Sequence, residues 1–191
     1  MEPLIKAASP EAEILFPLLA DLLDYPTESM METIEKVSLA LPEEIRTHSE
    51  LYADWQTFVK LATKIRMEGM QEIYTSTFDL NPVCPLFISI GLFGEENFNR
   101  SLFMARMIDA FNIYGFCLHP GELPDSIPTL LQFAPYIIEE ERYKSFIDDC
   151  LIKPSTDMLP KLEEKNNPYA AIFKLILHLT KTEIHQEIHH A

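Results

Sequence analysis

The sequence predicts an all-α fold, a single-domain bundle of about eight or nine helices that spans residues 1–191. Apolar residues recur at helical spacing along most of the chain. Only 5 glycines occur, and the one segment with strand propensity, residues 85–91, has no second such segment to pair with. A chain of 191 residues with 47% hydrophobic content is long enough to bury a core.

The first predicted helix covers residues 14–23, where apolar pairs recur at i, i+4 and i+8 and the pattern stops at Tyr25-Pro26. Pro17 inside this stripe implies either a kink or a late start. Ser29 and Glu32 have the spacing of a capping box, which predicts a second helix through about Leu39.

Further helices are predicted between residue 51 and Gly115. Residues 51–65 form one apolar face, and the helical pattern continues over 67–77 until Asn81-Pro82. We assign residues 85–91 to a buried helix. Residues 95–114 are predicted to form a central helix with little exposed face, ending at Gly115 as a C′ glycine.

Asp125 is a good N-cap for the next predicted helix, which buries Leu130, Leu131 and Phe133. Further helices are expected over 138–151, 157–164 and 168–180, and Asn167 is expected to cap the last one. The ends, residues 1–9 and 181–191, are expected to be disordered or frayed.

Charge and composition indicate which kinds of partner the protein can bind. Lys+Arg 15 against Asp+Glu 30 gives a net charge of −15, which repels nucleic acid and anionic lipid and favours a basic partner. The N-terminus lacks the pattern of a secretion signal and no stretch is long and apolar enough to span a membrane, so we expect a cytoplasmic protein without direct membrane insertion. Cys84, Cys117 and Cys150 lack metal-site spacing and are expected to be buried, reduced thiols.

No catalytic or cofactor motif is present, so we expect no enzyme activity, no cofactor and no metal. The glycines cannot form a phosphate-binding loop, and no nucleophile has a local signature around it. An alternative reading is a metal-binding helical protein that uses His185, His189 and His190 near the C-terminus.

The loop Glu122-Leu123-Pro124-Asp125 places two carboxylates beside a rigid proline at a helix start. It is either a capped helix start in which Asp125 accepts from its own amides, or part of a binding surface. Spacing leaves both interpretations open.

Four motifs together resemble the redox-enzyme maturation chaperones, most closely the nitrate reductase delta subunits, or molybdenum cofactor assembly chaperones. The trimethylamine N-oxide and dimethyl sulfoxide reductase chaperones are related. The motifs, in order, are Leu22-Leu23-Asp24-Tyr25-Pro26; Tyr74-x-x-x-Phe78-Asp79-Leu80; Gly94-Glu95 with Arg100 downstream; and Gly115-Phe116 leading to Glu122-Leu123-Pro124-Asp125-x-Ile127-Pro128.

The resemblance implies a non-catalytic helical chaperone whose partner is the catalytic subunit of a molybdenum-containing oxidoreductase. It implies binding of that subunit's N-terminal, twin-arginine-like segment, and it makes the protein a monomer or a helix-swapped dimer. The residues that match the family's partner-binding motifs and their surroundings are Glu122, Pro124, Asp125, Tyr74, Phe78, Asp79, Leu86, Arg100 and His119. Relatives often carry His where this chain has Ser126. A permanent structural subunit of a reductase is the remaining alternative.

Overall fold

The structure, a computed structural model of the chain, describes residues 7–47, 49–80, 82–94 and 97–185. The all-α prediction is confirmed: the described residues form helices joined by loops, with a single isolated bridge between Phe87 and Ser126. The α-helices are α1 (Pro10–Leu22), α2 (Met30–Ala40), α3 (Glu43–Thr47), α4 (Ser49–Tyr74), α5 (Ile88–Phe93), α6 (Phe98–Tyr114), α7 (Ile127–Phe133), α8 (Glu140–Phe146), α9 (Lys153–Glu164) and α10 (Ala170–His185).

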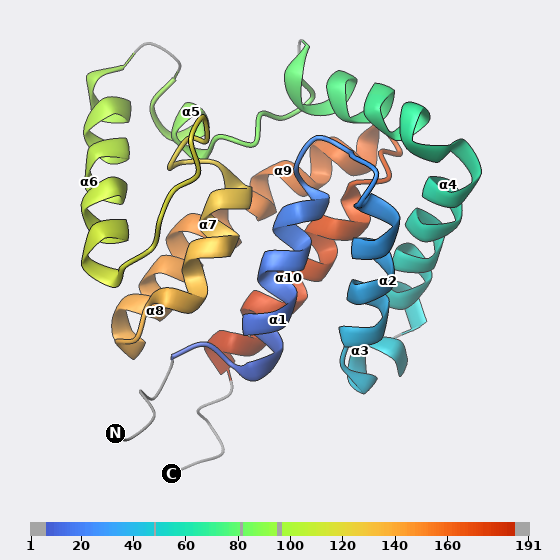
Figure 1. The fold of residues 1–191 in the computed structure, drawn as a ribbon, viewed down its shortest axis with the longest axis horizontal. Helices are drawn as coiled ribbons and strands as arrows, with labels where there is room; N and C mark the ends of the chain where they lie inside the picture. The colour runs from blue at the N-terminus through green and yellow to red at the C-terminus, as the bar shows by residue number, and fades with distance from the viewer. Residues whose placement is uncertain (1–6, 48, 81, 95–96, 186–191) are drawn as a thin grey trace.

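Helices α1 and α10 lie at the centre of the bundle, and α2, α4, α7 and α9 pack around them (Figure 1). Helix α1 contacts α2, α7 and α10, while α10 also contacts α4 and α9. The inward faces carry fully buried side chains such as Leu15, Leu19 and Phe173. Burying such side chains supplies most of the free energy that stabilises a domain of this size.

Helix α1 begins earlier than the apolar stripe predicted. The Ser9 side chain accepts a hydrogen bond from the amide of Ala12 at 3.1 Å, and Pro10 occupies the first helical position. Pro17 therefore lies inside the helix and does not mark its start. Proline suits the first turn because the missing N–H is unpaired there in any case.

The capping box predicted for α2 does not form. Ser29 is the N-cap residue, but its side chain makes no bond to the helix amides and instead contacts the Thr27 hydroxyl at 2.9 Å. Ser29 has helical backbone angles, φ −75° and ψ −13°, whereas a capping serine normally has extended ones. Its predicted position is correct and its predicted bond is wrong.

The two helices predicted over 51–65 and 67–77 are the two halves of α4, which breaks at Arg66. Arg66 has φ 62° and ψ −171°, a conformation that side-chain-bearing residues seldom adopt. The second half continues into a π-helical turn, η1 (Thr75–Asp79), closed by a 2.9 Å bond from the Leu80 amide to the Thr75 carbonyl. Wide turns of this kind are frequent at functional sites.

The helix predicted over 95–114 is present, but its predicted central position with little exposed face is wrong. Helix α6 begins at Phe98, and it lies at the edge of the molecule (Figure 1). Only Met107 and Phe111 are buried, whereas Phe98 is 80% and Ile113 71% exposed. The apolar residues are spread around the helix, so their number suggested burial that a single covered face does not provide.

The helices predicted towards the C-terminus are present in the structure. Helices α8 and α9 fall within or overlap the predicted spans, with a π-helical segment, η3 (Ile147–Ile152), between them. Asn167 accepts a bond from the Tyr169 amide at 3.0 Å just before α10, as predicted.

Parts of both predicted frayed ends belong to the folded domain. Ala8 is buried, and α10 runs on to His185. The Glu183 carboxylate accepts from the Ser9 amide at 2.9 Å and from the Tyr143 hydroxyl at 2.8 Å, which ties α10 to the start of α1. No helix in the described ranges is long and apolar enough to cross a membrane.

Candidate functional site

The loop between α6 and α7 is held in place at its start. Gly115 ends α6 with left-handed backbone angles, φ 70° and ψ 23°, as predicted for a C′ glycine. The next residue, Phe116, packs its ring 4.9 Å from Phe111 and 5.5 Å from Phe133. The loop therefore leaves α6 in a defined direction and brings His119 and Glu122 to one place.

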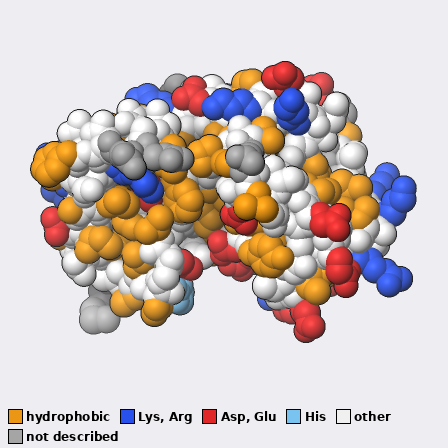
Figure 2. All heavy atoms as spheres, turned by 90° about the horizontal axis from the view of Figure 1, so that it is seen from above, with side chains coloured by type: hydrophobic (Ala, Val, Ile, Leu, Met, Phe, Trp, Pro, Cys, Tyr) orange, Lys and Arg blue, Asp and Glu red, His pale blue; other side chains and the backbone are white. Residues whose placement is uncertain are grey.

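Glu122 meets the segment that follows α1. Its charge, with that of Asp21, acts on the Asp24 carboxyl, and we call these three residues the acidic notch. Figure 2 shows acidic side chains gathered around a hollow in the molecular surface. The pKa of Asp24 rises to about 6, first because its carboxyl is partly enclosed and then because Glu122 and Asp21 lie nearby; His119 lowers it.

The acidic notch is only partly neutralised by its own chain, although the charge of Lys36 acts on Asp21 and that of His119 acts on Asp24. The Glu122 Oε2 atom is shielded from solvent and has no hydrogen-bond partner among the described residues. His119 is the sole basic side chain whose charge acts on Asp24 in the described part of the chain. A buried carboxylate oxygen without a donor is costly, so a cationic group placed here would gain strong, charge-assisted hydrogen bonds.

Asp125 does not cap α7, which corrects the sequence-based prediction. The N-cap is Ser126, whose hydroxyl accepts from the Thr129 amide at 3.2 Å. Asp125 is fully buried and accepts a very short hydrogen bond from the Ser89 hydroxyl, and Arg100 Nε lies 3.8 Å from its Oδ2. Its carboxylate faces the start of α5 and α6.

The neighbours of Asp125 are also internal. Pro124 and Leu86 are buried, and Arg100 has a side chain only 19% exposed. The Leu86 carbonyl accepts from the amide of Ile127 at 2.9 Å. The structure brings the predicted site residues Asp125, Leu86 and Arg100 together with Ser89, but in a buried position behind the loop. We call this group of residues the clamp.

Tyr74 and Phe78 form a further group, with ring centroids 5.2 Å apart and both side chains mostly buried. Tyr25 stands edge-on to Tyr74 at 5.6 Å. The charges of Asp79 and Asp24 act on the Tyr74 hydroxyl, although burial is the main reason that its pKa is raised. Tyr74 thus lies close to the acidic notch, while Phe78 supports it from within.

A separate apolar groove of about 630 Å³ lies beside the clamp. One wall comes from residues leading into α5 and from α5 and α6, namely Phe87, Ile88, Phe93 and Phe103; the other comes from η3 and α9, namely Cys150, Pro154 and Met158. We call these residues the apolar groove. No pattern in the sequence predicted this groove, because its two walls come from segments far apart in the chain.

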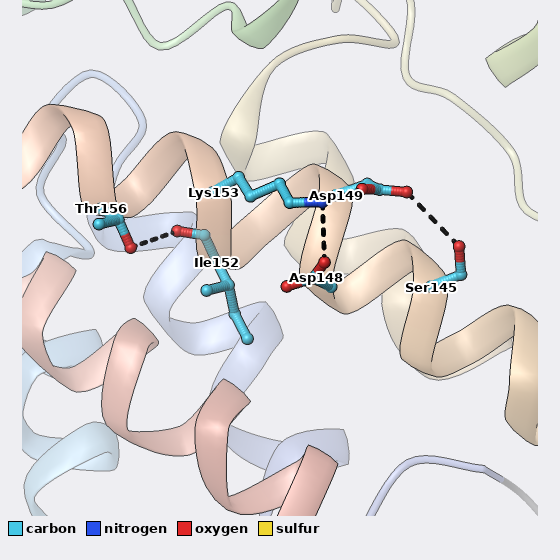
Figure 3. A network of polar contacts seen from close by, with 6 residues as sticks. All are labelled: Ser145, Asp148, Asp149, Ile152, Lys153 and Thr156. Carbon is cyan, nitrogen blue, oxygen red and sulfur yellow. Dashed lines mark hydrogen bonds and ion pairs between the residues drawn. The ribbon is translucent and has the colours of Figure 1, made fainter.

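Asp149 and Lys153 border the groove on the η3 and α9 side, and Figure 3 shows the polar contacts of this segment. Lys153 bridges Asp149 at 2.6 Å and Asp148 at 2.9 Å, and Asp149 also contacts the Ser145 hydroxyl at 3.5 Å. These exposed ion pairs contribute little to stability. Their charges neutralise one another, so the groove remains mainly apolar.

The structure also bears on the predictions for the cysteines and the C-terminal histidines. Cys84 and Cys150 are buried as expected, but Cys117 is exposed, which corrects its predicted burial. His189 and His190 lie outside the described residues, as does the side chain of His185. Within the described ranges, no group of three or more metal-binding side chains comes together.

Comparisons with known proteins agree on the type of protein. No family model matches the chain. It is 23% identical over 168 residues to the nitrate reductase molybdenum cofactor assembly chaperone NarJ of Escherichia coli strain K12, covering 87% of this chain and 70% of that one. It is 25% identical over 167 residues to the Bacillus subtilis strain 168 protein named "Probable nitrate reductase molybdenum cofactor assembly chaperone NarJ", covering 87% and 88%.

A solved structure shares the fold. The crystal structure of a protein from Archaeoglobus fulgidus, described as a redox enzyme maturation protein, superposes with a TM-score of 0.61 over 95% of this chain and 99% of that one, at 19% identity. The resemblance drawn from the four motifs is confirmed: the chain is similar in sequence to molybdenum cofactor assembly chaperones and shares the fold of a redox enzyme maturation protein.

Proposed function

We propose that this protein is a cytoplasmic, non-catalytic chaperone for the catalytic subunit of a molybdenum-containing oxidoreductase. It binds the N-terminal, twin-arginine-like segment of that subunit and holds it for cofactor insertion and assembly. The observation that carries the proposal is that a chain similar to the molybdenum cofactor assembly chaperones has both an acidic notch with an unpaired, buried carboxylate oxygen and an apolar groove. A basic and apolar segment needs both kinds of surface.

The acidic notch receives an arginine or lysine side chain of the segment. Asp24 and Glu122 come from distant parts of the sequence and offer carboxylate oxygens to one cation. Guanidinium groups bind paired carboxylates with good geometry, and their attraction sets association rate and selectivity more than affinity.

The apolar groove receives apolar side chains of the same segment. Its volume of about 630 Å³ falls inside the range of about 300–1,000 Å³ that is usual for ligand pockets. Phe93 and Phe103 are aromatic anchors of the kind that dominate binding energy, and Met158 can adapt to different partners.

The test begins with capture of the partner from the native cytoplasm and its identification, followed by calorimetric titration with a peptide of its N-terminal 30 or so residues. We expect binding that weakens about tenfold in Glu122→Gln at low salt, a loss that corresponds to about 1.4 kcal/mol. Phe103→Ser should weaken binding at any salt concentration, because it removes an apolar contact.

The matched control is Glu35→Gln on the exposed face of α2, which is not one of the three notch residues and should bind as the wild type does. The proposal fails if the captured proteins include no molybdenum-enzyme subunit, if its N-terminal peptide does not bind, or if Glu122→Gln and Glu35→Gln behave alike.

A chaperone and a permanent subunit differ in when they are bound. The proposed chaperone should copurify with the cofactor-free catalytic subunit and be missing from the mature enzyme. Equal amounts in both forms would instead identify a structural subunit.

A further inference from the structure

We infer that Asp125 positions the α5–α6 wall of the apolar groove and does not touch the bound segment. The inference rests on the proposed function for its binding readout, while its structural readout is independent of any partner. It assigns to Asp125 a different role from that of Glu122, three residues earlier in the same loop.

Asp125 is placed where a peptide cannot reach it. Its side chain is 0% exposed, as is that of Ser89, its hydrogen-bond donor. The other oxygen, Oδ1, is shielded from solvent and has no hydrogen-bond partner among the described residues. A peptide cation could reach this carboxylate only after the loop had separated from α5.

The clamp has side-chain and backbone parts that act on the same segment. Arg100 Nε donates to the Ser89 hydroxyl at 3.0 Å, and that hydroxyl donates to Asp125. The Ile88 amide donates to the Asp125 carbonyl at 3.0 Å, and the Ile127 amide donates to the Leu86 carbonyl at 2.9 Å. One short loop therefore holds the start of α5 and the first turn of α6.

The clamped segment carries one wall of the apolar groove. Phe87 and Ile88 directly precede Ser89, and Phe93 and Phe103 follow on α5 and α6. Helix α6 buries only Met107 and Phe111, so little other packing holds this wall. A wall with few buried contacts opens at low free-energy cost, and a buried, hydrogen-bonded charge pair is strongly destabilising to break.

The two possible roles of Asp125 make different predictions about peptide charge. If Asp125 binds a peptide cation, Asp125→Asn weakens only a basic peptide. If Asp125 positions the groove, the substitution weakens a basic peptide and its neutral counterpart equally, because both lose the same apolar contacts. Comparing the two losses isolates the charge-dependent term, as in a double-mutant cycle.

The experiment measures two peptides against the full-length protein and four variants. The peptides are the N-terminal segment of the captured subunit and the same segment with its Arg and Lys residues replaced by Gln. We expect Asp125→Asn and Ser89→Ala each to weaken both peptides by about tenfold, and the double variant to be no more than about twofold worse than the weaker single variant. Glu122→Gln, the control in the same loop, should weaken the basic peptide alone.

The structural readout is amide hydrogen exchange in the absence of peptide. Asp125→Asn and Ser89→Ala should raise exchange over residues 88–114 by about tenfold or more, with α1 and α10 unchanged. Glu122→Gln should leave exchange over 88–114 as in the wild type. If Asp125→Asn does not fold, Ser89→Ala decides the matter, since it removes only the bridging hydroxyl.

The results separate the two proposals. A wild-type protein that binds no peptide overturns the proposed function, and the exchange measurement then still decides the role of Asp125. A loss confined to the basic peptide, or unchanged exchange over 88–114 in both clamp variants, overturns the positioning role and leaves the proposed function standing.

Discussion

Replacing Asp24 with Asn is predicted to stabilise the free protein at neutral pH and to weaken its binding of basic peptides. Asp24 follows the end of α1, where the helix dipole disfavours a negative charge, and it lies beside Asp21 and Glu122. The amide keeps nearly the same shape without the charge. A residue that costs stability and serves binding is typical of functional sites.

The magnitude follows from the pKa of Asp24, which rises from 3.8 to about 6 in the folded protein. At about 1.36 kcal/mol per pKa unit the full shift corresponds to about 3 kcal/mol. Because the Asp24 side chain is exposed overall, solvent screening reduces this to roughly 1 kcal/mol. For a domain of this length, that gain raises Tm by about 2–4 °C.

The pH dependence has a definite sign. Between pH 4 and pH 6 the folded protein holds a proton on Asp24 that the unfolded chain has lost, so this group's favourable contribution is complete below about pH 4 and disappears as pH rises through about 6. Asp24→Asn removes that dependence. The stability difference between variant and wild type should be near zero at pH 4 and reach its full value above pH 7.

The assay is urea unfolding of both proteins at pH 4, 5, 6 and 8, with Glu35→Gln as a control of equal charge change on an exposed helix face. The control should stay within about 0.5 kcal/mol of the wild type throughout. A variant that is less stable than the wild type at pH 8, or equally stabilised at pH 4 and pH 8, would refute the electrostatic reasoning.

Three further predictions concern other parts of the molecule. Tyr169→Phe should change the free energy of unfolding by less than about 1 kcal/mol, or raise it, because the Tyr169 hydroxyl is buried and has no hydrogen-bond partner among the described residues; urea unfolding measures this, and a large loss would show that the hydroxyl is bonded. Gly115→Ala should cost about 1–2 kcal/mol by the same measurement, since no atom within 4 Å would clash with the new side chain and the cost comes from the positive φ alone; a neutral result would contradict it. Binding of the basic peptide should fall with added salt while binding of its Arg and Lys-free counterpart changes little, and equal salt dependence in calorimetry would exclude ionic contacts in the notch.

The helical content of the fold could be predicted because helix formation depends on residues three and four positions apart. The stripe in α1, the left-handed Gly115 and the cap at Asn167 are all local patterns of this kind, and all appear in the structure. Helix boundaries were predicted less accurately than helices, because α1 begins at Pro10, capped by Ser9, before its apolar stripe begins.

The placement of α6 could not be predicted, because the number of apolar residues in a helix does not say which neighbours cover it. Its apolar residues suggested a central position, yet the helix lies at the edge with Phe98 and Ile113 exposed. Cover is supplied by elements distant in sequence, and periodicity carries no information about them.

The sequence by itself determined the all-α class, the acidic character and the absence of catalytic motifs, and it singled out the loop around Glu122 with two interpretations left open. Only the tertiary structure decided what the carboxylates of that loop do. It joins Glu122 to Asp24 at the surface and turns Asp125 inward to Ser89 and Arg100. Both outcomes depend on long-range packing, which sets the burial and neighbours of a charge and therefore its chemistry.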